Sequence, residues 1–272
     1  MGVSVLHKEY KRKVGGYDEY DNLIAGSEGT ISLTLYDDDS DDLKNATRLS
    51  NYNGIENVNV TLSGRMLYKD DSWNTICLPF DMTAAQVTAQ LAPSKLMTLS
   101  TATFSEGTLT LNFADATAIE AGKPYIIKWT SGDYFTPTFT GVTINSAAPT
   151  DVEKTAANFH GIYSPYSTGG EDKTMLYLGA ANKLYYPNDA MTINAFRAYF
   201  KLNGITAGDL PNEARAFVLN FGDGEHTGIS LTPDPSPKGE GSEYYDMQGR
   251  RLSGKPTAKG LYISNGRKVY VK

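Results

Sequence analysis

The sequence has few of the residues from which metal and nucleophile sites are built. Among its 272 residues are one cysteine, Cys77, and three histidines, His7, His160 and His226, far apart in the chain. One cysteine forms no internal disulfide, and there is no His-x-x-x-His pair or cysteine cluster of the kind that binds zinc. Cys77 lies in an apolar run, Asn74–Phe80, without a histidine nearby. We therefore expect a buried small side chain there, not a nucleophile.

Long apolar runs and an excess of positive charge are also missing. No stretch is long enough to span a bilayer, and residues 1–13 lack the apolar centre of a signal peptide. The net charge of −6 disfavours nucleic acid and anionic membranes as partners, because both attract basic surfaces. We expect no membrane insertion. The chain is then either cytoplasmic or cut from a longer secreted precursor, and composition leaves both open.

What the sequence does contain is a series of short runs that alternate apolar and polar residues between glycine and proline turns. The clearest runs are 30–36, 58–63, 97–104, 107–113, 124–129, 175–178, 183–186, 195–202 and 216–221. Helical signals are few: the Ala-rich segment Thr83–Leu91, with Asp81 or Thr83 as N-cap, and a short turn near Asp209 to Glu213. We predict a mostly β chain, an antiparallel β-sandwich of the immunoglobulin-like or jelly-roll type with one or two short helices.

Composition also divides the chain into segments. Residues 227–242 contain three alternate prolines followed by glycines, which predicts an exposed linker. Residues 243–272 carry a net charge of +5, which leaves −11 for the rest. Their Asn265-Gly266 pair, between two strand-like runs, predicts a C-terminal β-hairpin unit. The sandwich is expected over 25–226, and 1–24 is an N-terminal extension or the end of a preceding module.

One acidic run has part of the pattern of a calcium loop. Asp37, Asp39 and Asp41 have alternate spacing, but the sixth position is Asp42, where the loop needs glycine, and the twelfth is Arg48, where it needs an acid. A solvated loop after the first strand is the favoured interpretation. Ca²⁺ is kept as the weaker hypothesis, and no other cofactor is expected.

Exposed aromatic rings would offer a route to sugar binding, because sugars stack on flat apolar faces that have a polar edge. The candidates are Trp73, Trp129, Tyr134 and Tyr166. For the two tryptophans, which belong to strand-like runs, packing in a β core is the favoured alternative.

Four ordered blocks, 59–80, 121–127, 176–188 and 191–200, resemble a module of large secreted or surface proteins of the Bacteroidota. That resemblance implies an adhesin-like or leucine-rich-repeat-associated protein that is exported and has no assigned activity. The pattern in 245–251, 259–263 and 265–266, with a final lysine, is similar to the sorting segments that the type IX secretion machinery reads. It implies that secretion machinery is a partner of the tail.

The expected function is therefore that of a non-catalytic structural or adhesive module that binds a protein or a glycan through its loops. Two alternatives stay open. A carbohydrate-binding module requires an open row of aromatic rings, and a glycoside hydrolase-associated or weak hydrolase domain requires two facing carboxylates in a cleft. The block around Trp73 is expected to stabilise the fold whichever function is right. The same holds for the strand-like run that contains Arg197, which we expect as a paired or exposed cation.

Overall fold

The computed structural model describes residues 31–39, 44–179, 182–208 and 213–222 with their side chains. It also describes the backbone of the strands within 226–230, 244–245, 260–264 and 267–271. The predicted N-terminal extension, 1–24, lies outside the described residues. The chain divides into two compact units, Met1–Asp234 and Pro235–Lys272, and each is described by itself.

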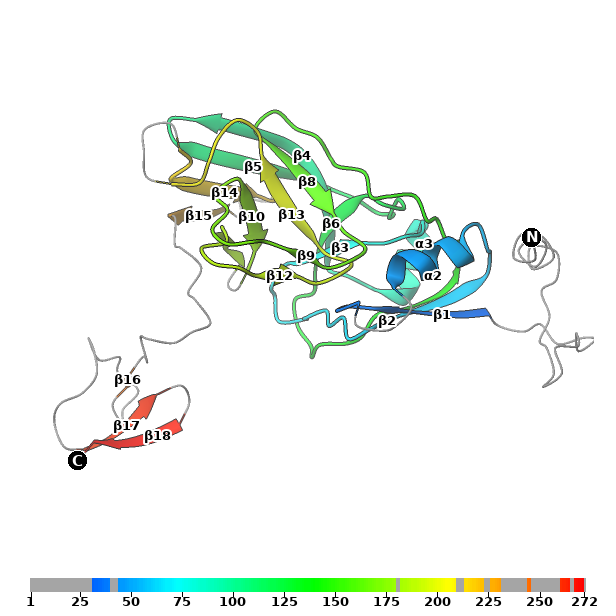
Figure 1. Ribbon diagram of the computed structural model, residues 1–272, viewed down its shortest axis with the longest axis horizontal. Coiled ribbons are helices and arrows are strands. Elements are labelled where there is room, and N and C mark those ends of the chain that lie inside the picture. Colours follow the sequence, from blue (N-terminus) through cyan, green and yellow to red (C-terminus); the bar gives the residue numbers. More distant parts are fainter. Residues whose placement is uncertain are drawn as a thin grey trace, which may run out of the picture. The chain divides into compact units, whose positions relative to one another are not determined.

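The first unit is built mainly from strands (Figure 1). Its strands are β1 (Ile31–Tyr36), β2 (Val58–Ser63), β3 (Asn74–Cys77), β4 (Lys95–Ser105), β5 (Thr108–Asp115), β6 (Pro124–Lys128), β7 (Thr138–Val142), β8 (Ala157–Gly161), β9 (Tyr166–Ser167), β10 (Met175–Leu178), β11 (Leu184–Tyr185), β12 (Thr192–Ile193), β13 (Ala198–Leu202), β14 (Ala216–Asn220) and β15 (His226–Ser230). Its described helices are α2 (Asn45–Tyr52) and α3 (Ala84–Gln90). The mostly β fold predicted from the sequence is confirmed.

Two sheets enclose the larger part of this unit as a sandwich. A six-stranded sheet has the order β15-β14-β5-β4-β6-β3, and a four-stranded sheet has the order β11-β10-β13-β8. Alternate side chains of β5, including Leu109 and Phe113, face Phe159 and Phe200 of the second sheet in one apolar core. The rings of Phe159 and Phe200 stack with their centroids 4.6 Å apart. The period of two in the sequence thus places one face of each sheet in the core.

A third layer covers the other face of the six-stranded sheet near β6. All five residues of β6 are buried, because Ile126 belongs to the core of the sandwich while Tyr125 and Ile127 belong to a second core. That second core lies against the three-stranded sheet β1-β2-β7 and the helices, with α2 next to β1 and α3 next to β7. A strand that is buried on both faces explains why Pro124–Lys128 lacks polar alternation.

The sequence predicts helix α3 but not helix α2. Thr83 caps α3 as predicted: its hydroxyl accepts from the backbone of Gln86, whose side chain accepts from the backbone of Thr83. Helix α2 is missing from the prediction. It is the crossover between β1 and β2, which pair in parallel, as β14 and β5 also do. The sheets are therefore mostly, not wholly, antiparallel.

The second unit contains β16 (Tyr244–Tyr245), β17 (Gly260–Ser264) and β18 (Arg267–Val271), in that order in one antiparallel sheet. Ser264 pairs with Arg267, which is the register expected of two strands joined by two residues, and the predicted turn residues Asn265-Gly266 lie outside the described residues. The predicted linker begins too early. Residues 227–230 belong to β15, which pairs with β14, because the alternation of 226–230 continues the sheet before the first proline.

Cys77 is fully buried, as expected, and its burial raises the pKa of the thiol well above its ordinary value. Within the part of the chain that the structure describes, no helix is both long enough and apolar enough to cross a membrane.

Candidate functional site

The loop between β2 and β3 forms a rigid wall at one side of the sandwich. Gly64, with φ of 81°, ends β2. Farther along, the buried Asn74 amide accepts from the backbone N–H of Tyr68 and donates to the carbonyls of Tyr68 and Ser72. The backbone N–H of Trp73 donates to Asn182, from a distant loop. Because the side chain of Asn74 holds both ends of the turn, the loop is fixed before any ligand arrives.

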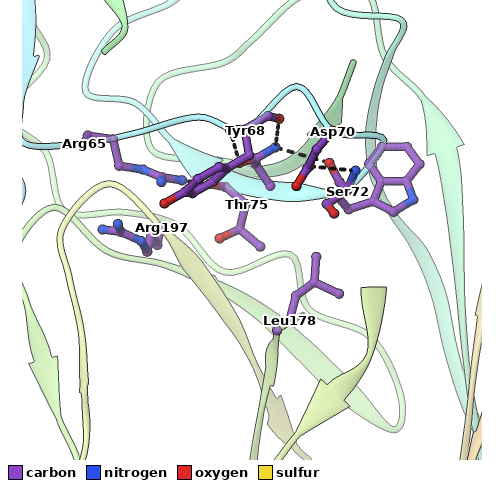
Figure 2. A pocket seen from close by; sticks show the side chains of 10 residues that line it. Arg65, Tyr68, Asp70, Ser72, Thr75, Leu178 and Arg197 are labelled. Atoms are coloured by element: carbon purple, nitrogen blue, oxygen red, sulfur yellow. Dashed lines mark hydrogen bonds between the residues drawn. The ribbon is translucent and has the colours of Figure 1, made fainter. Parts of the chain in front are cut away.

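This loop borders a pocket of about 440 Å³ (Figure 2). The pocket is lined by Arg65, Tyr68, Asp70, Ser72, Trp73, Asn74, Thr75, Leu178, Gly179 and Arg197. A second pocket of about 260 Å³ shares Thr75, Leu178 and Arg197 with it. Most of the lining side chains are polar, with donors and acceptors of both kinds, which suits a ligand rich in hydroxyl groups.

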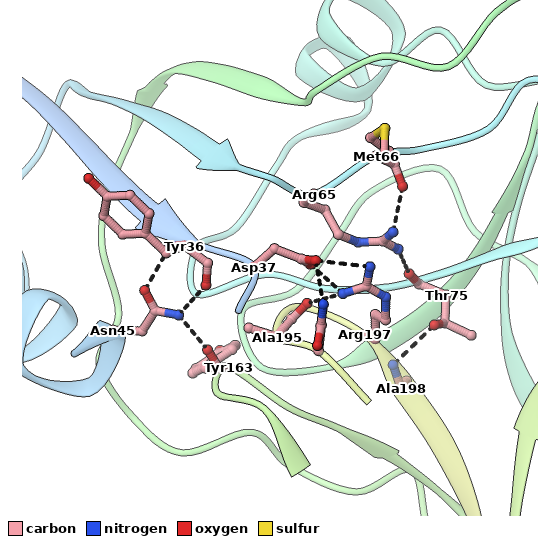
Figure 3. Close-up of polar contacts among 11 residues, drawn as sticks. Tyr36, Asp37, Asn45, Arg65, Met66, Thr75, Tyr163, Ala195, Arg197 and Ala198 are labelled. Atoms are coloured by element: carbon pink, nitrogen blue, oxygen red, sulfur yellow. Dashed lines mark hydrogen bonds and ion pairs between the residues drawn. The ribbon is translucent and has the colours of Figure 1, made fainter. Parts of the chain in front are cut away.

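Arg197, which lines the pocket, forms an ion pair with Asp37 (Figure 3). Nη1 of Arg197 donates to Oδ1 of Asp37, and Nη2 donates to Oδ2 at 3.2 Å. Asn194 also donates to Asp37, at 2.9 Å. The two pair members are 160 residues apart in the chain, so the contact ties β1 to the loop before β13.

The loop that carries Arg197 is held at every step. The backbone N–H of Ala195 donates to the carbonyl of Asp37, and that of Ala198 donates to the hydroxyl of Thr75. Between them, the buried Phe196 has a φ of 57°, in a region that bulky residues rarely adopt. Such a conformation persists only where the surroundings determine it, and here it points to a loop under constraint beside the pocket.

Arg65 lines the same pocket, although it is only 4% exposed. Its Nη1 donates to the carbonyl of Met66 at 2.6 Å and its Nη2 to that of Thr75 at 2.7 Å. Its Nε is buried without a hydrogen-bond partner among the described residues. Burial, and then the positive charge of Arg197, lower the pKa of Arg65 to about 9.

The most exposed apolar side chains lie next to this wall, on two paired segments, Met66–Tyr68 and Tyr134–Thr136. Leu67 and Phe135 exchange two backbone hydrogen bonds of 3.0 Å. Leu67 is buried, so Met66 and Tyr68 point outward, and the Tyr134 ring lies 6.2 Å from the Tyr68 ring. Tyr68 is 46% and Tyr134 is 62% exposed. We call these two segments the tyrosine ribbon.

The two tryptophans proposed for sugar stacking belong to the cores. Trp73 is buried, with its ring stacked on Phe221 at 4.7 Å and covered by the Lys128 ammonium at 5.3 Å. Trp129 is buried too, and its Nε1 donates to the carbonyl of Leu91. Each side chain is only 5% exposed, so neither offers an open ring face for sugar stacking, and the packing alternative holds for both.

The two tyrosines among the candidates are exposed. Tyr134 belongs to the tyrosine ribbon, and Tyr166 on β9, 37% exposed, stacks on the buried ring of Tyr199 at 5.1 Å. The structure places Tyr134 beside Tyr68, which the sequence did not single out. The sequence signal for Tyr68 is the two-residue period of an extended segment. In Met66-Leu67-Tyr68, a buried Leu67 turns the side chains of Met66 and Tyr68 outward.

The calcium hypothesis gives Asp37 a role that the structure assigns differently. Asp37 is buried and already binds the cationic side chain of Arg197. Asp39 caps Asn45, whose backbone N–H donates to its Oδ1 at 2.7 Å, and Asp41 lies outside the described residues. Among residues 31–39, 44–179, 182–208 and 213–222, no group of three His, Cys, Asp or Glu side chains is placed to hold a metal ion.

In comparisons with known proteins, no family model, no curated protein and no solved structure matches this chain. The site is therefore interpreted from its own geometry.

Proposed function

We propose that the first unit is a non-catalytic adhesive module that binds a glycan at the tyrosine ribbon and the adjoining polar pocket. It would serve as part of a secreted or cell-surface protein, as the Bacteroidota resemblance implies. The observation that carries the proposal is the pair of exposed rings, Tyr68 and Tyr134, at the edge of a preformed pocket.

The surface of the described residues supports this location. Their exposed large apolar side chains are Met66, Tyr68, Tyr134 and Tyr166, and three of these four lie on the tyrosine ribbon. A concentration of exposed apolar side chains beside polar groups is typical of a binding surface. Tyrosine rings offer a flat apolar face, and the nearby Asp70 and Ser72 offer hydrogen-bonding groups for sugar hydroxyls.

Replacement of either ring tests the proposal. We expect Tyr68→Ala and Tyr134→Ala each to weaken glycan binding about tenfold, which corresponds to roughly 1.4 kcal/mol. The measurement is binding of the full chain to a glycan array, followed by calorimetry on the strongest hit. Tyr166→Ala is the matched control, because its ring is also exposed but stacks on Tyr199 and belongs to neither segment of the tyrosine ribbon. Loss of binding in Tyr166→Ala alone would contradict the proposed location.

The hydrolase alternative has less support at this pocket. A glycosidase uses two carboxyl groups that flank the scissile bond. Among the described residues that line the pocket, Asp70 is the only acid. Asp37, the carboxylate that pairs with the lining residue Arg197, also accepts from Asn194 (Figure 3). A binding role fits this arrangement better than a catalytic one.

We propose that the second unit is an export or anchoring signal. Its own three-stranded sheet and the net positive charge of 243–272 distinguish it from the first unit. Deletion of 243–272 is expected to abolish export in the host organism and to leave folding of the first unit intact. Fractionation of cells and medium measures this. Undiminished export of the truncated chain would refute the proposal.

A further inference from the structure

The pocket wall carries hydrogen-bond donors for which the described protein supplies no acceptor. Arg197 uses Nη1 for Asp37 and for the carbonyl of Ala195, and one N–H of Nη2 for the second oxygen of Asp37. Its Nε–H and the other N–H of Nη2 lie side by side on the adjacent edge of the guanidinium. No described residue accepts from either of these two donors. Two parallel N–H groups match the two oxygens of a carboxylate.

Arg65 adds a second donor of the same kind. Its Nε is buried and unpartnered, although its other two nitrogens are bound to the carbonyls of Met66 and Thr75. A buried donor without an acceptor is unfavourable, so a ligand oxygen that reaches it would gain more than in water. Arg65 and Arg197 both line the same pocket.

The side of the pocket that carries Arg65 and Arg197 also has an excess of positive charge. Two guanidinium groups share one carboxylate, Asp37, and the lowered pKa of Arg65 reflects the repulsion by Arg197 together with burial. Figure 2 shows the two arginines on one side of the pocket and Asp70 with Ser72 on the other. Oδ1 of Asp70 accepts from the backbone N–H of Ser72, which leaves Oδ2 as an acceptor for a ligand hydroxyl.

We infer that the glycan bound at this pocket is an acidic one, whose sugar carboxylate accepts from the open edge of Arg197 while its hydroxyl groups reach Asp70 and Ser72. This inference rests on the proposed function and gives its ligand class. A cationic end and an acceptor end lie across one pocket. A sugar acid matches both ends, whereas a neutral sugar leaves the arginine donors with weaker acceptors and a simple anion has no hydroxyl group for Asp70.

Two natural sources share this chemistry, the hexuronic acids and the sialic acids. They are distinguished by calorimetry of the full chain with four probes: trigalacturonate and 3′-sialyllactose, each compared with its own methyl ester. We expect one of the two acids to bind at least tenfold more tightly than its neutral counterpart. The acid that does so identifies the source. The comparison changes only the ligand, so it does not depend on the folding of any variant.

Arg197→Lys supplies the matching change in the protein. Lysine keeps the positive charge and one contact with Asp37 but has no parallel pair of N–H groups, so it preserves the ion pair better than alanine. We expect the variant to lose the tenfold preference for the acid, so that the acidic and neutral probes bind it with equal affinity. Arg215→Lys, at an exposed arginine elsewhere, is the control and should change nothing.

The outcomes separate this inference from the proposed function. Equal affinity for the acidic and neutral probes, or a preference that Arg197→Lys leaves intact, overturns the acidic ligand while a Tyr68-dependent glycan hit still supports the module. Absence of binding to all four probes also overturns the acidic ligand. A failure of every glycan on the array, by contrast, overturns the proposed function itself.

Discussion

Alanine in place of Asp37 is expected to lower the free energy of unfolding by about 2–3 kcal/mol, because removal of the buried carboxylate from this partly buried ion pair leaves the arginine charge uncompensated. Here the loss is shared by two cations. Arg197 loses its only described carboxylate partner, and the buried Arg65 loses the negative charge that opposes its repulsion by Arg197. The hydrogen bond that Asn194 donates to Asp37 is lost as well.

Equilibrium denaturation by urea at neutral pH, followed by tryptophan fluorescence, measures this change because both tryptophans are buried in the first unit. Asp115→Ala is the matched control, since Asp115 is exposed, and its effect should stay within about 0.5 kcal/mol. Asp37→Asn keeps the shape but not the charge and should lie between the two. A loss below about 1 kcal/mol in Asp37→Ala would mean that water, not the protein, compensates the arginines.

Much of the fold followed from local pattern. The strands were visible because half-buried strands alternate, and β4 and β5 were joined correctly because Glu106 and Gly107, both with positive φ, form the hairpin turn. Helix α3 was visible because Thr83 and Gln86 form a capping box. In each case the residues that determine the structure are neighbours in the sequence.

The missed elements depend on distant contacts. Helix α2 has no side-chain cap at Lys44, and of its eight residues only Asn45 and Leu49 are buried. Its residues are mostly weak helix formers, so packing and not propensity holds it. The parallel pairing of β1 and β2 follows from this helix, since parallel neighbours need a crossover between them.

The candidate site was foreseen only in fragments. Tyr134 was named for its chemistry, and Arg197 was expected as a paired or exposed cation. Asp37 was expected in a solvated loop or, on the weaker hypothesis, as a calcium ligand, because nothing near it in sequence suggests an arginine partner 160 residues away. Burial of Trp73 was the favoured alternative, but its stacking partner could not be deduced, because Phe221 follows β14 and lies far from Trp73 in the sequence.

Alanine in place of Asn45 is expected to lower the free energy of unfolding by about 2–4 kcal/mol, because three backbone groups lose their partner and each unpaired buried group costs about 1–3 kcal/mol. Asn45 is fully buried. Its Oδ1 accepts from the N–H of Tyr36, and its Nδ2 donates to the carbonyls of Tyr36 and Tyr163 at 2.7 and 3.2 Å. The amide thus extends the edge of β1 as a further strand would.

Asn45→Asp tests the hydrogen bonds of Asn45 without changing the volume of the side chain. Urea denaturation measures the stability of this variant and of Asn45→Ala. The carboxylate keeps the Oδ1 acceptor and the shape but loses both N–H donors and faces two carbonyl oxygens, so at neutral pH it should be no more stable than Asn45→Ala. Asn59→Ala is the control: its amide accepts one exposed hydrogen bond, from Gly141, and its loss should stay below about 1 kcal/mol. Wild-type stability in Asn45→Asp would show that packing alone holds α2 against β1. A loss in both variants would show that one amide fixes the crossover, and with it the end of β1 from which Asp37 reaches Arg197.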